Sequence, residues 1–134
     1  MVEVALAVPL RGHRVLVAVR DPRAEQGGLW EFPGGKIQPD EPAGSAALRE
    51  LKEETGLQAG QLEPLMVFVH DYPDNTIRFH CFVARDPAGE VEIGNGRRWS
   101  WVDYEELNGL PMPAANASIV RALRWRLHRT PGPR

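Results

Sequence analysis

The sequence predicts an α/β domain in which helices cover a mixed β-sheet. The chain has 134 residues, which is the length of one domain, so residues 1–134 are expected to form a single unit. Short apolar, β-branched runs recur along most of it, whereas two segments carry helical signals. The elements follow the order β-β-loop-α-β-β-β-β-α, and helices that interrupt such a series of strands are expected to cover a sheet.

The strand-like segments are apolar runs separated by turn residues. Residues 2–8 and 14–19 lie on either side of a turn-like Arg-Gly-His sequence, so they predict a β-hairpin. Further strands are expected at residues 65–71, 76–85, 90–93 and 98–102. The 12 prolines and 13 glycines of the chain divide it into short elements of this kind.

Two helices are predicted. Residues 42–55 begin with a proline, which suits a first helical turn, and they are followed by Gly56, which is a C-terminal stop signal. Residues 117–128 predict an amphipathic helix, because apolar side chains recur there at helical spacing. These side chains are Ile119, Val120, Leu123 and Leu127.

The segments between and after these elements differ in character. Residues 20–40 contain so many prolines and glycines that we expect a long loop without regular structure. Trp30 and Phe32 within it favour an ordered loop, and ordered loops of this length are commonly functional. Residues 130–134 are expected to form a disordered tail.

Composition and charge exclude several classes of protein. The 16 basic and 18 acidic side chains give a net charge of −2, which argues against a polycationic protein that binds nucleic-acid polymers. The single cysteine, Cys81, excludes an internal disulfide framework and a Cys-rich zinc site. No apolar run approaches the ~20 residues that span a bilayer. We expect a cytoplasmic protein without a membrane partner, either a monomer or a homodimer.

Three carboxylates share one face of the first predicted helix. Glu50, Glu53 and Glu54 are three and four positions apart, and like charges at this spacing lower helix stability. A cation would neutralise them, and carboxylates without neighbouring histidine or cysteine favour hard ions such as Mg²⁺, Mn²⁺ or Ca²⁺. The alternative, from these three residues alone, is an acidic helix face exposed to solvent.

The pattern around these glutamates resembles a known family signature. Residues 35–57 read Gly-x5-Glu-x7-Arg-Glu-Leu-x-Glu-Glu-x-Gly-Leu, and this resembles a Nudix box. The resemblance implies an α/β/α sandwich that carries the box as a loop-helix-loop. It also implies a Mg²⁺-dependent hydrolase, with Mn²⁺ as a substitute, that cleaves nucleoside diphosphates linked to another moiety.

The resemblance assigns roles to particular residues. Metal ligands would be the carbonyl of Gly35 and the carboxylates of Glu50, Glu53 and Glu54. Glu50 is an alternative general base. Arg49 would orient the glutamates through salt bridges, since it lies four residues before Glu53, and Glu41 would organise the loop.

Further segments resemble MutT-type 8-oxo-dGTP diphosphatases. These are Leu-Trp-Glu-Phe-Pro-Gly-Gly-Lys at 29–36, Tyr-Pro-Asp at 72–74 and the Pro-Ala-Asn segment that ends at 116. The resemblance implies that Asn116 reads the base edge, although an Asn just before a helix is also a typical N-cap. The other substrate-binding residues would be Arg20 at the triphosphate, Phe32 and Asp74 in the base pocket, and Val4 and Leu6 as its apolar floor.

One segment departs from the MutT-type pattern. These enzymes carry an additional glutamate, either a metal ligand or the base, before the strand that contains a tryptophan. Here residues 90–99 are shorter, and two arginines precede Trp99. Glu92 is the candidate equivalent, so the general base stays open between Glu50, Glu53 and Glu92.

These observations predict a Mg²⁺-dependent nucleoside triphosphate diphosphatase. It would release a nucleoside monophosphate and diphosphate, prefer oxidised purines such as 8-oxo-dGTP, and so sanitise the nucleotide pool. Alternative substrates are CTP, a modified dCTP or ADP-ribose. A non-catalytic nucleotide-sensing module is a further alternative, but such domains typically lack the box glutamates that this chain retains.

Overall fold

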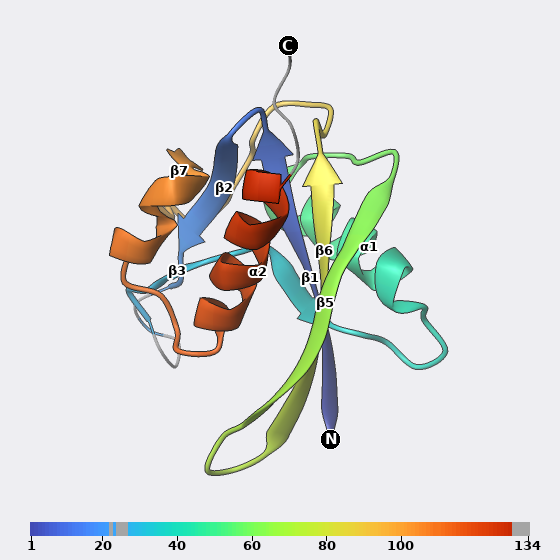
Figure 1. Cartoon of the computed structure of the whole chain (residues 1–134). Coiled ribbons are helices and arrows are strands. Elements are labelled where there is room, and N and C mark those ends of the chain that lie inside the picture. The colour runs from blue at the N-terminus through green and yellow to red at the C-terminus, as the bar shows by residue number, and fades with distance from the viewer. Residues whose placement is uncertain (22, 24–26, 130–134) are drawn as a thin grey trace.

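The computed structural model describes residues 1–21, 23 and 27–129, so the expected tail at 130–134 lies outside the described residues. Figure 1 shows the elements in sequence order. The strands are β1 (Val2–Arg11), β2 (Arg14–Val19), β3 (Trp30–Glu31), β4 (Gly34–Lys36), β5 (Leu62–Asp71), β6 (Thr76–Arg85) and β7 (Trp99–Asp103). The helices are α1 (Ala43–Thr55), the 3₁₀ helix η1 (Tyr104–Gly109) and α2 (Asn116–Arg129).

The strands form one mixed sheet, as predicted. Its main path is β3-β2-β1-β6-β5, with β4 also paired to β1 and β7 paired to β2. β1 and β2 form the expected antiparallel hairpin, whereas β1 and β6 are parallel from Val2 and Ile77 to Leu10 and Arg85. A parallel pair needs a long crossover connection, and α1 lies within that connection.

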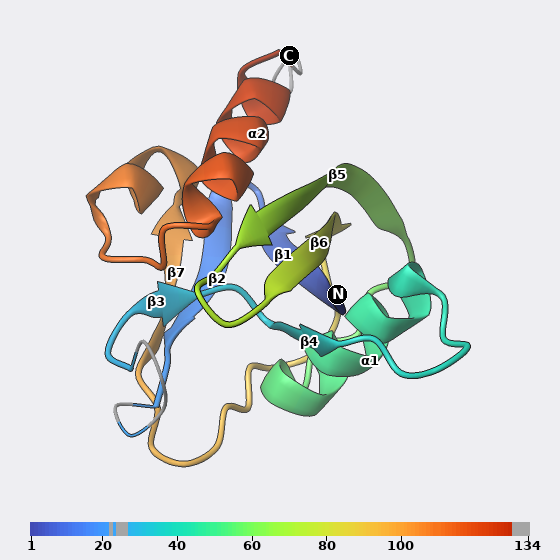
Figure 2. The ribbon, with the colours of Figure 1, turned by 90° about the horizontal axis from the view of Figure 1, so that it is seen from below.

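Helices cover both faces of the sheet, which confirms the predicted layers. Figure 2 shows β1 and β6 between α2 and α1. The residues of β1 alternate between the two cores: Leu6 and Val8 pack in the cluster of α2, and Ala5 and Ala7 pack in the cluster of α1. The α1 side is built from small side chains on both partners, so the helix lies close to the sheet.

Helix α1 has the ends that the sequence predicts. It begins after Pro42, whose φ of −62° suits a helix start. It ends at Gly56, which has a left-handed φ of 78° and donates its N–H to the Lys52 carbonyl. These two ends determine which turn of the helix carries each box glutamate.

Two expectations were wrong. The segment 20–40 is not free of regular structure, because it contains β3 and β4; both are too short to produce a local pattern and form by pairing with β2 and β1. Residues 90–93 do not form a strand. Instead the Glu92 N–H donates to the Thr55 carbonyl at 2.7 Å, so this segment is held against the end of α1 rather than against a strand.

The other boundaries differ by a few residues. β5 starts at Leu62 rather than at 65, although Pro64 lies within it. A proline is tolerated there because β5 is an edge strand and its register shifts between Pro64 and Met66. Among the described residues, no helix is both long and apolar enough to cross a membrane.

Candidate active site

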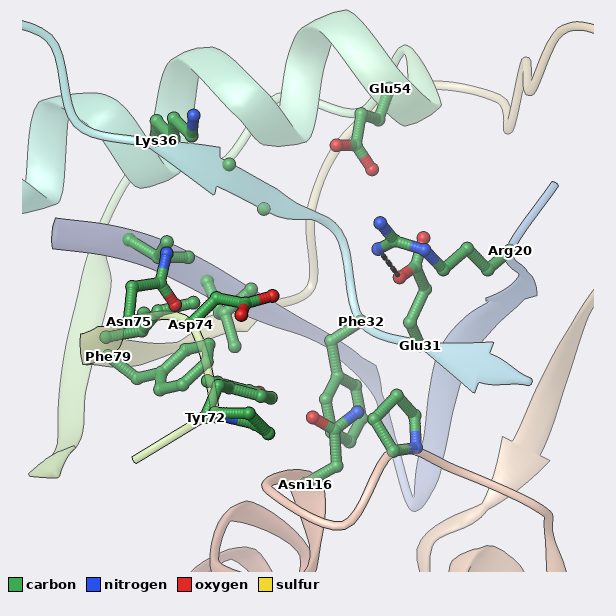
Figure 3. A pocket seen from close by; sticks show the side chains of 17 residues that line it. Arg20, Glu31, Phe32, Lys36, Glu54, Tyr72, Asp74, Asn75, Phe79 and Asn116 are labelled. Carbon is green, nitrogen blue, oxygen red and sulfur yellow. Dashed lines mark hydrogen bonds and ion pairs between the residues drawn. The ribbon is translucent and has the colours of Figure 1, made fainter. Parts of the chain in front are cut away.

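A cavity of about 560 Å³ opens beside the box helix. Its wall combines residues from β1, β4, β6, the β5–β6 turn and the starts or ends of both α-helices (Figure 3). All six predicted substrate-binding residues line it: Val4, Leu6, Arg20, Phe32, Asp74 and Asn116. The predicted metal ligands Gly35 and Glu54 also line it. The fold therefore joins segments that are far apart in the sequence.

One end of the cavity is aromatic and apolar. Phe32 is 3% exposed and forms part of the wall, and Phe79 lies there with its ring stacked on Phe68 at a centroid distance of 5.0 Å. Asn116 and Asp74 provide polar groups at this end, which Figure 3 shows across the cavity from Glu54. This end suits a flat, polar-edged ring such as a nucleobase.

Asn116 is a buried polar residue on the cavity wall. It is 7% exposed, and it is the first residue of α2 rather than the residue before the helix. Its backbone N–H donates to the Pro113 carbonyl at 2.9 Å. Figure 3 shows its amide group beside the ring of Phe32, so both the amide donor and the amide acceptor lie at the base end.

The other end of the cavity is charged. Glu54, Arg20 and Glu31 line it together with Gly34 and Gly35. Arg20 donates from its guanidinium to Glu31 Oε2 at 3.2 Å. A guanidinium group beside carboxylates and backbone forms a site that suits phosphate groups and a cation.

The second glycine of β4 allows the backbone to lie against a box glutamate. A Cβ atom on Gly35 would lie 2.5 Å from the carboxyl carbon of Glu50, which is closer than such atoms approach in proteins. The Glu50 side chain is 15% exposed, so its carboxylate is wedged between α1 and β4. Glycine therefore leaves room here for the end of the Glu50 side chain, which an added methyl group would displace.

Arg49 holds three carboxylates at once. Its guanidinium donates to both oxygens of Glu41 at 2.8 and 2.9 Å, to Glu50 at 2.9 Å and to Glu53 at 3.3 Å. It also donates to the Lys36 carbonyl at 3.2 Å. These bonds hold the loop before α1 and two glutamates of the helix in one arrangement. The pairing lowers the pKa of Glu41 to about 2.

Glu54 lies in a different electrostatic environment. Burial raises its pKa to about 8, and the negative charges of Glu31 and Glu50 add to the shift. Arg97 and a hydrogen bond from the Gly34 backbone partly oppose it. The carboxylate is thus under-compensated, which is the condition that a bound cation relieves.

The donor set fits a divalent hard cation. Carboxylates of Glu50 and Glu54 lie near the backbone of β4, and Glu53 projects from the same helix face. Within residues 1–21, 23 and 27–129, no three His, Cys, Asp or Glu side chains come near enough to one another to form a ready-made metal site. In this arrangement Arg49 engages Glu50 and Glu53, so a metal would have to share those carboxylates with the guanidinium.

The structure does not bring Glu92 to the cavity. Its side chain is exposed beside the end of α1, near Gly56, and its backbone is bonded to Thr55. Glu53 and Arg49 also lie outside the cavity wall, and the Glu53 side chain is 58% exposed. Of the three glutamates considered as a general base, Glu50 is the one that contacts a residue of the wall.

Sequence reasoning missed two charged residues of the cavity wall. Glu31 binds Arg20 and also accepts from Arg97 at 3.1 Å, and Lys36 lines the cavity. Glu31 and Lys36 lie in the glycine-rich entry segment, but the local pattern gives no sign of which side chains point inwards. The two-residue strand β3 has no periodicity of its own, and its orientation depends on pairing with β2.

Comparison with known proteins identifies the class that this fold and site define. A model of the NUDIX domain matches residues 2–123. The solution structure of the E. coli ORF135 protein superimposes with a TM-score of 0.83 at 31% sequence identity, covering 96% of this chain and 93% of that one. The chain therefore belongs to the Nudix hydrolase family.

Within that family the chain is of the MutT type. It is 32% identical over 122 residues to the CTP pyrophosphohydrolase of Escherichia coli strain K12, covering 91% of this chain and 90% of the relative. It is 38% identical over 84 residues to an 8-oxo-dGTP diphosphatase of Proteus vulgaris, covering 63% of this chain and 75% of the relative. The predicted family and fold are thus confirmed, whereas the two relatives differ in the substrate that each is named for.

Proposed function

We propose that this Nudix hydrolase is a Mg²⁺-dependent nucleoside triphosphate diphosphatase that prefers oxidised purines such as 8-oxo-dGTP. One water would be consumed per nucleotide, giving a nucleoside monophosphate and diphosphate. The observation that carries the proposal is the single cavity with two unlike ends: Asn116 and Phe32 at one, Glu54 and Arg20 at the other. A nucleotide has the same division between a flat base and an anionic phosphate chain.

The base end has the hydrogen-bonding groups that an oxidised purine requires. Oxidation at C8 of guanine adds an oxygen acceptor there and turns N7 from an acceptor into an N–H donor. An Asn amide offers one donor and one acceptor side by side, so Asn116 can pair with both groups. The carboxylate of Asp74 accepts hydrogen bonds, which suits the amino group of guanine.

The phosphate end would hold the metal between box carboxylates and substrate. The ligands we propose are Glu50, Glu53, Glu54 and the carbonyl of Gly35. Bound Mg²⁺ supplies positive charge at the phosphates and makes water a better nucleophile. Arg20 lines the same end and would stabilise negative charge as the phosphoanhydride bond breaks.

Glu50 is our candidate for the general base. Its carboxylate contacts the backbone of Gly35 at the cavity wall, and Arg49 holds one of its oxygens at 2.9 Å. The other oxygen could accept a proton from the attacking water. Arg49 and Glu41 would then act through positioning, because they contact the glutamates rather than the cavity.

A second candidate is hydrolysis of CTP or of a modified dCTP. The relative that matches over 91% of this chain is a CTP pyrophosphohydrolase. Asp74 supports this reading as well, because a carboxylate can accept from the N4 amino group of cytosine. The two candidates share their chemistry at the phosphate end and differ in what Asn116 and Asp74 contact.

A substrate panel tests the proposal. Purified protein with Mg²⁺ would be assayed for kcat/KM on 8-oxo-dGTP, dGTP, CTP, 5-substituted dCTP and ADP-ribose. We expect 8-oxo-dGTP to give the highest value and Asn116→Ala to reduce it towards that of dGTP. A higher kcat/KM for CTP, unchanged in Asn116→Ala, would favour the second candidate. No hydrolysis of any of these nucleotides, measured by the loss of substrate, would leave a non-catalytic nucleotide-binding module.

A further inference from the structure

A second cavity, of about 400 Å³, adjoins the charged end of the active site and is rich in arginine. Its lining includes Arg20, Arg23, Arg97 and Arg98, with Asp21 and Asn95. Arg20 lines both cavities, so the two cavities adjoin at this residue. Arg97 and Arg98 are the two residues by which this sequence departs from the MutT-type pattern before Trp99.

A tight turn brings these two arginines to the cavity. Asn95 and Gly96 both have left-handed backbone, with φ of 64° and 65°, and the Arg97 N–H donates to the Gly94 carbonyl at 3.3 Å. Asn-Gly is the preferred sequence for a turn of this type. The Arg98 carbonyl then accepts from the Val19 N–H at 2.8 Å, which joins the turn to the end of β2. Figure 2 shows the segments after β2 and before β7 at the same end of the sheet.

The described residues of the arginine pocket carry more positive than negative charge. Glu31 binds Arg20 at 3.2 Å and Arg97 at 3.1 Å, and Arg97 also donates to the Val19 carbonyl. Asp21 binds Arg23. The guanidinium of Arg98 lies over the ring of Trp30 at 5.6 Å and is paired with no carboxylate among the residues that the structure describes. Within residues 1–21, 23 and 27–129, four guanidinium groups therefore meet two carboxylates.

We propose that this arginine pocket binds the distal phosphates of the nucleotide, which leave as diphosphate. The inference rests on the proposed function. The base would lie at Asn116 and the phosphate chain at the charged end, where Arg20 lines both this cavity and the arginine pocket. Guanidinium groups bind phosphate oxygens through paired, charge-assisted hydrogen bonds. Arg98 is the principal ligand, because its guanidinium has no competing carboxylate in the described part of the chain.

Product inhibition of the full-length protein tests this role. Arg98→Gln removes the charge, and Arg98→Lys keeps the charge but loses the planar fork. Arg121→Gln is the matched control, because Arg121 is exposed on α2 and lines neither cavity. We expect Arg98→Gln to raise the inhibition constant of inorganic diphosphate about tenfold, which corresponds to one lost charge-assisted hydrogen bond. The inhibition constant of the nucleoside monophosphate should be unchanged, and Arg121→Gln should change neither.

Calorimetric titration of the protein with magnesium diphosphate, without nucleotide, measures binding at the arginine pocket independently of nucleotide hydrolysis. Weaker binding in Arg98→Gln would support the pocket even if no nucleotide were hydrolysed, in which case the proposed function alone would fail. Equal binding by wild type, Arg98→Gln and Arg23→Gln/Arg98→Gln would overturn the pocket, even with active enzyme. Arg98→Gln could also weaken the binding of inorganic phosphate and diphosphate while it leaves KM for the triphosphate unchanged. In that case the pocket binds free anions, and its role in substrate binding is overturned.

Discussion

The guanidinium of Arg49 donates hydrogen bonds to both oxygens of the Glu41 carboxylate, at 2.8 and 2.9 Å, across the loop that enters the box helix. The same guanidinium also reaches Glu50 and Glu53 on the helix. One side chain therefore fixes the loop and two glutamates relative to each other. Planar, forked donors are needed to do this, and lysine lacks them.

Replacement of Arg49 by lysine should damage activity more than folding. The variant keeps the charge but cannot bind both oxygens of Glu41 and still reach the helix glutamates. We expect kcat to fall by at least about tenfold, with a smaller loss of unfolding free energy, because the lysine still carries the positive charge. Steady-state kinetics and urea unfolding would measure the two effects. A variant with normal kcat would contradict the positioning role of Arg49.

The bond between Arg49 and Glu41 should make the fold sensitive to acid. The pKa of Glu41, about 2, lies below the ordinary value of 4.5. The Glu41 carboxylate therefore binds fewer protons in the folded than in the unfolded chain. Its stabilising contribution is complete above pH 4.5 and is lost as the pH falls towards 2. Urea unfolding between pH 2 and 6 should give a flatter dependence for Glu41→Gln than for wild type. Identical slopes would rule the contribution out.

Glu54 should behave in the opposite way. Its pKa of about 8 is above the ordinary 4.5, so in the metal-free protein its contribution to stability declines as the pH rises from 4.5 to 8. If Glu54 is a metal ligand, Mg²⁺ binding below pH 8 must release its proton. Titration of Mg²⁺ in two buffers of different ionisation enthalpy should detect this release in wild type and not in Glu54→Gln. Equal proton release by both proteins would exclude Glu54 as its source.

Removal of a box carboxylate should separate chemistry from stability. We expect Glu53→Gln and Glu54→Gln each to lower kcat by orders of magnitude, because each removes a proposed ligand. Stability without metal should change little, and Glu53→Gln should be neutral or stabilising, since like charges on one helix face repel. Glu106→Gln, at an exposed position in η1, is the control. Turnover at the wild-type rate by Glu53→Gln would remove that residue from the ligand set.

Two glycines provide a matched pair of alanine substitutions. A methyl group at Gly35 would meet the Glu50 carboxylate at 2.5 Å, whereas one at Gly44 would meet nothing within 4 Å. Gly35→Ala should therefore displace Glu50 and lower kcat. Gly44→Ala, within α1, should leave kcat unchanged and stabilise the protein by up to ~1 kcal/mol. Kinetics and thermal unfolding of both variants would check this. Equal kcat values for Gly35→Ala and Gly44→Ala would contradict the close packing of Glu50 against Gly35.

The parts of the fold that sequence could predict are those with local causes. The ends of α1 follow from Pro42 and Gly56, which act on the backbone directly. The glutamates of the box share a face because of helical periodicity alone. The aromatic and polar residues of the base end came from resemblance, and the structure brings Phe32 and Asn116 to one cavity.

The parts that sequence could not predict depend on distant partners. β3 and β4 exist because β2 and β1 accept them, and two or three residues carry no period. The role of Glu31 depends on Arg97, which is 66 positions away. Residues 90–93 look like a strand locally, but their backbone bonds to the end of α1 instead. In each case the deciding contact is remote in the chain.

The parallel pairing of β1 with β6 also has a kinetic consequence. Leu6, on the cavity floor, lies opposite Cys81 in the register, so a long stretch of polypeptide must be brought together before this pair can form. Closing so large a loop costs entropy before any contact repays it. We therefore expect the cavity to form late in folding, after the first hairpin and the box helix.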